Sequence, residues 1–174
     1  MKWLLTWLVV AGLSLTAFTA EKRSAQGWQV HFSPHGGCTE AVVDALGKSR
    51  KSVLVQAYSF TSAPIAKALV DARRRGVNVQ VILDHSQKTE KYSEADFLRN
   101  SGIPTFIDSK HTIAHNKVMV LDGNVVITGS FNFTKAAEEH NAENLLIIDD
   151  ATLADRYTKN WQDHVKHSEP YAGR

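Results

Sequence analysis

The sequence predicts an α/β fold, a single domain built on a mixed, largely parallel β-sheet with helices on both faces. The chain has 174 residues, of which 43% are hydrophobic and 22% charged, as in a soluble globular domain with one core. Short β-rich runs alternate with helical periods in the first half, which indicates parallel β-α-β units. The pair Asp122-Gly123 separates two further β-type runs and favours a tight type I′ turn, so an antiparallel hairpin makes the sheet mixed.

The first twenty residues differ in composition from the rest of the chain. Met1 and Lys2 precede an uncharged, mostly apolar stretch over 3–20 that contains several small residues near its end. This pattern is typical of a secretory signal peptide, although it is also long enough for a membrane anchor. We therefore expect residues 1–20 to be a signal peptide, or an uncleaved anchor, and residues 21–174 to form the domain. The protein would be periplasmic or secreted in the first case, without stable membrane association, and membrane-anchored in the second.

The remaining elements follow from hydrophobic periodicity and from stop signals. In the first helix Thr39 is the expected N-cap and Gly47 the expected stop, and Gly76 closes the second helix. The expected helices cover 39–46, 63–75, 93–100 and 151–167. The expected strands cover 29–32, 52–60, 77–83, 104–107, 115–121, 124–128 and 144–148.

Charge, cysteine and histidine content limit the possible partners. The net charge of +2 is too small to identify a polyanionic substrate, so any nucleic-acid binding would depend on local basic patches. Cys38 is the single cysteine, which excludes an intrachain disulfide and a cysteine-based zinc site. None of the eight histidines shows His-x3-His spacing with carboxylates on an expected helix, and His111 and His115, which are four apart, lie on an extended segment that does not bring them together. The sequence therefore predicts neither a metal nor a cofactor.

One segment carries a concentration of reactive side chains. His115 and Lys117 are two apart on an expected strand and so face the same side, as do Ser130 and Asn132 if that segment is also extended. An imidazole, an ammonium, a hydroxyl and an amide on a buried sheet need a compensating ligand. An anionic ligand would compensate them, because Lys117 supplies a positive charge and Ser130 and Asn132 supply neutral hydrogen-bond donors.

The order of these residues resembles a known motif. The pattern His-x-Lys-x4-Asp-x6-Gly-Ser-x-Asn, from His115 to Asn132, is similar to the HKD motif of the phospholipase D superfamily at every defined position. The resemblance covers about residues 28–167 and includes the run 53–60, the helix ending at Gly76 and the strand that follows it. It implies the phospholipase D fold and, in particular, the small bacterial endonucleases with one motif per chain.

The resemblance also implies roles for the motif residues. His115 would form a covalent phosphohistidine that water then hydrolyses, and Glu143 would hydrogen-bond this histidine and orient it. Asp122 belongs to the motif and is counted with the catalytic residues, although its place in a tight turn indicates a structural role. The groups expected to hold the substrate phosphate are those of Lys117, Gly129, Ser130 and Asn132.

A single motif leaves the reaction without its general acid, which family members take from a second HKD histidine. Another copy of the chain would supply it, because a two-fold interface brings identical residues face to face. We therefore expect a homodimer with one composite active site at its interface.

The substrate is less determined than the chemistry. The short chain and the lack of an evident lipid-binding insertion favour a non-specific endonuclease acting on DNA, or also on RNA. Lys110 and His111, just before the motif, are then expected to touch the substrate backbone. The alternatives are a phospholipase D-type hydrolase of phospholipid headgroups and a non-catalytic nucleic-acid binding protein.

Overall fold

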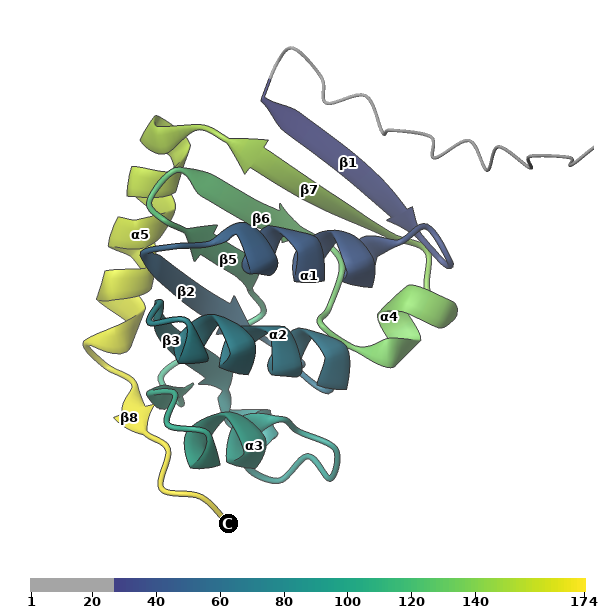
Figure 1. The fold of residues 1–174 in the computed structure, drawn as a ribbon. Coiled ribbons are helices and arrows are strands. Elements are labelled where there is room, and N and C mark those ends of the chain that lie inside the picture. The colour runs from purple at the N-terminus through teal and green to yellow at the C-terminus, as the bar shows by residue number, and fades with distance from the viewer. Residues whose placement is uncertain (1–26) are drawn as a thin grey trace, which may run out of the picture.

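One eight-stranded sheet runs through residues 27–174, the part of the chain that the computed structural model describes (Figure 1). Its strand order is β1-β7-β6-β5-β2-β3-β4-β8. The strands are β1 (Trp28–Ser33), β2 (Ser52–Ala57), β3 (Asn78–Asp84), β4 (Thr105–Asp108), β5 (Lys117–Leu121), β6 (Val125–Gly129), β7 (Glu143–Asp149) and β8 (Glu169–Pro170). The two-residue β8 was not expected from the sequence.

The sheet is mixed, as predicted, but its parallel part is confined to β2, β3 and β4. Helices connect these three strands, and each helix returns the chain to the end of the sheet at which the preceding strand began. The other strand pairs among the described residues are antiparallel: β1 with β7, β7 with β6, β6 with β5, β5 with β2, and β4 with β8. A tight turn between β5 and β6 reverses the chain there. In the turn Asp122 and Gly123 have φ values of 55° and 75°, which confirms the predicted type I′ geometry.

Helices cover both faces of the sheet (Figure 1). Three of them lie side by side on one face, and α5 crosses the other face in contact with β2, β4, β5 and β6. The helices are α1 (Cys38–Lys48), α2 (Ala63–Arg74), α3 (Ala95–Asn100), α4 (Lys135–Glu139) and α5 (Ala151–Val165), with a 3-10 turn η1 (His85–Lys88) after β3.

The start of α1 differs from the sequence prediction. The N-cap is Gly37, with φ of 77°, and Thr39 lies inside the helix. The carboxylate of Glu138, from α4, accepts the backbone N–H groups of Gly37 at 3.1 Å and of Thr39 at 2.7 Å. The carboxylate of Glu138, distant in sequence, thus caps the start of α1 in place of the predicted hydroxyl of Thr39. The predicted stop at Gly47 is also wrong, since the helix continues through this residue and ends at Lys48.

The larger part of the core lies between the sheet and the helices α1, α2 and α3, and in it Phe60, Phe131 and Phe133 are fully buried. Phe60 and Phe133 pack edge to face, with ring centroids 5.8 Å apart. Because Phe131 and Phe133 alternate with Ser130 and Asn132, the same packing anchors the second half of the motif. On the other face, the indole N–H of Trp161 in α5 donates to the carbonyl of Val55 at 2.8 Å.

The predicted signal peptide or anchor at residues 1–20 lies outside the described residues. Within residues 27–174, none of the helices combines the length and the apolar character needed to cross a membrane.

Candidate active site

The imidazole of His115 is exposed and lies against the ring of Tyr58, with ring centroids 4.6 Å apart. Tyr58 directly follows β2, and its backbone N–H donates to the carbonyl of Asn116 at 2.8 Å. The expected strand over 115–121 begins two residues later, at Lys117. The Tyr58 ring, which the sequence reasoning missed, therefore brings His115 and Lys117 together. The only sequence signal for it is an aromatic residue at the end of a β-rich run.

The side chain of Lys117 is buried, and its ammonium lies beside the Tyr58 ring. Its Nζ lies 5.1 Å from the centroid of the Tyr58 ring and donates to the carbonyl oxygen of His115 at 2.8 Å. Burial lowers the pKa of Lys117, and the nearby carboxylate of Glu143 opposes that shift. An ammonium has three donors, and within residues 27–174 this one makes a single hydrogen bond. Two N–H groups therefore remain for an anionic ligand.

The segment of Ser130 and Asn132 meets the same end of β2. The backbone N–H groups of Thr61 and Ser62 both donate to the carbonyl of Phe133 at 3.0 Å. The structure thus gathers both halves of the motif around the residues that follow β2, although they are separated by the β5–β6 hairpin.

Gly129 and Asn132 each show a feature of a built site. A Cβ at Gly129 would lie 2.2 Å from the carbonyl oxygen of Asn144, so only glycine allows this approach of β7. The N–H of Asn144 donates to Ser130 Oγ at 3.0 Å. The Oδ1 of Asn132 is buried and has no hydrogen-bond donor among the described residues. A half-turn of this amide presents Nδ2 at the same place, which suits an oxygen of a bound phosphate.

Asp122 lies at the other end of β5 from Lys117, because Leu121 pairs with Val53 and Lys117 with Ala57 at opposite ends of β2. Its carboxylate accepts the three backbone N–H groups of residues 50–52, at distances from 2.7 to 3.2 Å. Burial raises the pKa of Asp122, but these hydrogen bonds outweigh it and hold the pKa below its usual value. Asp122 therefore acts as a clamp that ties the β5–β6 hairpin to the start of β2.

Glu143 is the first residue of β7, and one of its oxygens accepts a hydrogen bond from the side chain of Asn141 at 3.0 Å. Within residues 27–174 no hydrogen bond joins Glu143 to His115. Its charge does act on Lys117, whose pKa it raises against the effect of burial. The orienting role of Glu143 stays a prediction.

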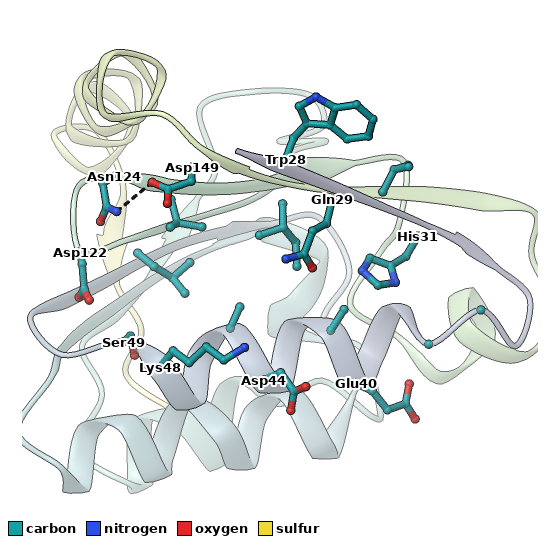
Figure 2. A pocket seen from close by; sticks show the side chains of 18 residues that line it. Trp28, Gln29, His31, Glu40, Asp44, Lys48, Ser49, Asp122, Asn124 and Asp149 are labelled. Atoms are coloured by element: carbon teal, nitrogen blue, oxygen red, sulfur yellow. Dashed lines mark hydrogen bonds between the residues drawn. The ribbon is translucent and has the colours of Figure 1, made fainter. Parts of the chain in front are cut away.

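A groove between β1 and α1, with a volume of about 960 Å³, is a separate feature (Figure 2). Figure 2 shows Gln29 and His31 on its β1 side and the charged side chains of Glu40, Asp44 and Lys48 along α1. Of the motif residues only Asp122 lines it, with its carboxylate already bound by backbone amides. The groove is therefore not the place where the motif would hold a phosphate.

A second polar cluster lies where β4 ends. The buried carboxylate oxygen Asp108 Oδ2 lies 2.8 Å from His164 Nδ1, 3.1 Å from His111 Nδ1 and 3.3 Å from His167 Nε2. Burial raises the pKa of Asp108, but the hydrogen bonds from His164, the Lys110 N–H, His167 and His111 hold it well below its usual value. This cluster was not predicted from the sequence. Its only local signal is the three-residue spacing within the pairs 108/111 and 164/167.

Comparison with known families defines the class of the protein. A family model described as "Cardiolipin synthase, PLD-like domain" matches residues 42–165, most of the chain. Together with the sheet and the complete sequence motif, this match shows that the chain belongs to the phospholipase D superfamily, a class of enzymes that act on phosphodiester bonds.

Individual members of the superfamily resemble the chain more closely. Its structure is similar to that of Nuc, a phospholipase D family member from Salmonella typhimurium, with a TM-score of 0.80 and 41% identity, covering 83% of this chain and 97% of that one. A protein named Phospholipase D from Rickettsia conorii is 40% identical over 88% of this chain and 77% of its own length. The Phospholipase D of Rickettsia bellii is 45% identical over 75% of this chain, which spans 65% of that relative.

Proposed function

We propose that the protein is an exported phosphodiesterase that cleaves nucleic acid as a non-specific endonuclease, with His115 as nucleophile and no metal ion at the reacting phosphorus. The observation that carries this proposal is the pairing of an exposed imidazole with the buried, incompletely bonded ammonium of Lys117. A neutral imidazole can attack phosphorus, and a fixed cation beside it offsets the charge on the phosphate oxygens.

The reaction takes place in two displacements. A ring nitrogen of His115 attacks phosphorus, a P–N bond forms, and the P–O bond to the leaving group breaks as that oxygen takes a proton from a general acid. Water then attacks phosphorus, gives a proton to the same group acting as base, and breaks the P–N bond. The donors of Lys117, Ser130 and Asn132 and the close approach at Gly129 hold the phosphate oxygens through both steps.

The general acid is His115 of the partner subunit in a two-fold dimer. The support is the single motif in the chain and an apolar stripe at the edge of the sheet. Val30 and Phe32 on β1 have exposed fractions of 36% and 63%. Phe32 pairs with Asn144, which in turn holds Ser130. The stripe thus continues to the motif, and covering it with a second copy would bury apolar surface beside the site.

The surroundings of the site favour nucleic acid as substrate. The segment 85–94 is tied to the end of β2 by two hydrogen bonds of Phe60, from its N–H to Gln87 Oε1 at 3.2 Å and to its carbonyl from the Glu94 N–H at 3.0 Å. This segment carries Lys91 and the exposed ring of Tyr92. A cation next to an exposed aromatic ring suits a strand with a charged backbone and stacking bases.

A phospholipid headgroup is the second candidate substrate. The observation that favours it is the name Phospholipase D carried by both Rickettsia relatives. A non-catalytic nucleic-acid binding protein is a weaker alternative, because binding alone has no use for a nucleophilic histidine.

The test is plasmid cleavage by the purified protein in excess EDTA, beside a His115→Ala variant. Cleavage that survives EDTA and disappears in the variant is the expected result. A folded protein that leaves plasmid intact but releases headgroups from phospholipid vesicles would establish the second candidate. Binding of DNA without turnover of either substrate would support the third.

A further inference from the structure

Four metal-ligand side chains converge at the end of β4, apart from the HKD motif. Asp108, His111, His164 and His167 each offer one ligand atom, and all four atoms lie within 4.8 Å of one another. They come from three parts of the chain: the end of β4, the loop before β5, and the end of α5 with the turn after it. The short β8 pairs with β4 and so returns the residues after α5 to Asp108.

Hydrogen bonding alone accounts poorly for this arrangement. Three imidazole nitrogens lie within 3.3 Å of the single oxygen Asp108 Oδ2. A carboxylate oxygen has about two lone-pair sites, so three donors exceed its capacity. The imidazole centroids are also only 4.9 to 5.3 Å apart, which would crowd three positive charges if all were protonated.

We propose that this cluster binds one divalent transition-metal ion, with Zn²⁺ as the preferred ion. The ligand atoms would be Asp108 Oδ2, His111 Nδ1, His164 Nδ1 and His167 Nε2. A tetrahedral zinc site with bonds of about 2.0–2.1 Å has ligand atoms about 3.3 Å apart, close to the three distances around Asp108 Oδ2. Three imidazoles with one carboxylate favour Zn²⁺ over Mg²⁺ or Ca²⁺, which prefer oxygen ligands.

The role of the ion is structural, because four protein ligands leave no open position for water or substrate. Asp108 is fully buried and His164 is 15% exposed, whereas His111 is 43% exposed on the loop before β5. The ion would therefore tie that loop to the end of α5. The same loop is held from β3 by Asp84, whose Oδ2 accepts the Ala114 N–H at 2.7 Å. Together these contacts position the segment that leads into His115.

The experiment uses the full chain, stripped of metal and titrated with Zn²⁺ against a chromophoric chelator, with Co²⁺ absorption as the probe of coordination. We expect one ion per chain, a tetrahedral Co²⁺ spectrum and a higher melting temperature with Zn²⁺. The double variant His164→Gln/His167→Gln should weaken binding by about 100-fold or more, and His111→Ala by at least about tenfold. His140→Ala, a side chain with an exposed fraction of 73%, is the matched control and should bind as the wild type does.

Circular dichroism of the metal-free variants shows whether each is folded. A folded wild type without stoichiometric Zn²⁺ binding, or a folded double variant that binds as tightly as the wild type, would overturn the proposal. The outcome does not depend on the proposed function. His115→Ala should bind Zn²⁺ normally, and a chain that binds Zn²⁺ but cleaves no phosphodiester would refute the activity and leave the metal site standing. EDTA-resistant cleavage by the double variant would show that the ion takes no part in the chemistry.

Discussion

Two residues of the motif, Gly129 and Asp122, determine how the backbone packs around them. At Gly129 the missing Cβ makes room for the carbonyl of Asn144, whose N–H holds Ser130. At Asp122 two carboxylate oxygens hold three backbone N–H groups of the segment that starts β2. Both residues shape the sheet on which the site is built, and neither needs to touch substrate to do so.

Gly129→Ala should cost about 3 kcal/mol of unfolding free energy, because the new Cβ must displace the Asn144 carbonyl. It should also reduce cleavage, since Ser130 moves with β7. Urea unfolding beside a cleavage assay measures both effects. The matched control is Gly47→Ala in α1, where nothing lies within 4 Å of an added Cβ. This control should stabilise by about 0.5 kcal/mol, and equal losses in the two variants would contradict the steric argument.

Asp122→Asn should lower stability by about 1–2 kcal/mol at neutral pH and leave most of the activity, whereas His115→Asn should abolish activity. The pKa of Asp122 is depressed in the folded protein, so its contribution is complete above the ordinary aspartate pKa of about 3.9 and is lost as pH falls through the lower folded value. The stability difference between wild type and variant should therefore shrink in acid. Urea unfolding at a series of pH values measures it, and a difference that grows in acid would contradict the clamp.

At the scale of elements, the short helix α4 supplies the N-terminal cap of the longer helix α1. Both oxygens of Glu138 are used, one for the Gly37 N–H and one for the Thr39 N–H. Helix starts carry unsatisfied N–H groups and a partial positive charge, so an acid from a neighbouring element serves as a cap. The contact also joins the segment after the motif to the first helix of the fold.

Glu138→Ala should therefore cost about 1–2 kcal/mol, as the loss of a cap does. Glu139→Ala is the matched control, because within residues 27–174 its carboxylate makes only surface ion pairs, with Lys135 and His140. The control should cost about 0.5 kcal/mol or less. Thermal and urea unfolding of the two variants test the difference, and a larger loss for Glu139→Ala would show that the cap contributes little.

At the scale of the whole molecule, the chain holds one motif at one end of a sheet whose edge strand β1 exposes apolar side chains. The proposed active site made from two copies would explain both observations. It would also make the activity of each copy depend on its partner, which independent sites would not.

Mixing wild type with the His115→Ala variant under exchange tests this dependence. When equal amounts are mixed, a composite site should leave about one quarter of the activity of the same total amount of wild type, and independent sites should leave about one half. A linear loss of activity on mixing would rule out the shared site.

Phe32→Asp should weaken association in analytical ultracentrifugation, because it places a charge in the apolar stripe of β1.

Much of the fold was predictable because its signals are local. The alternation of strands and helices, the Asp122-Gly123 turn and the helices on both faces follow from side-chain periodicity and turn chemistry. The extent of the parallel pairing was overestimated, because strand order and direction depend on connections that periodicity does not describe. The predicted N-cap of α1 was wrong for a similar reason, since Glu138, which accepts the first N–H groups of this helix, is distant in sequence.

By itself the sequence determined the family, the motif and its candidate residues, because all of these are read from residue identity and spacing. Only the tertiary structure placed Tyr58 against His115, separated Asp122 from the reacting end of the sheet, and joined Asp108 to His164 across 56 positions of the chain. The physical reason is that such contacts depend on how the chain closes its loops, and spacing within one segment carries no information about its distant neighbours.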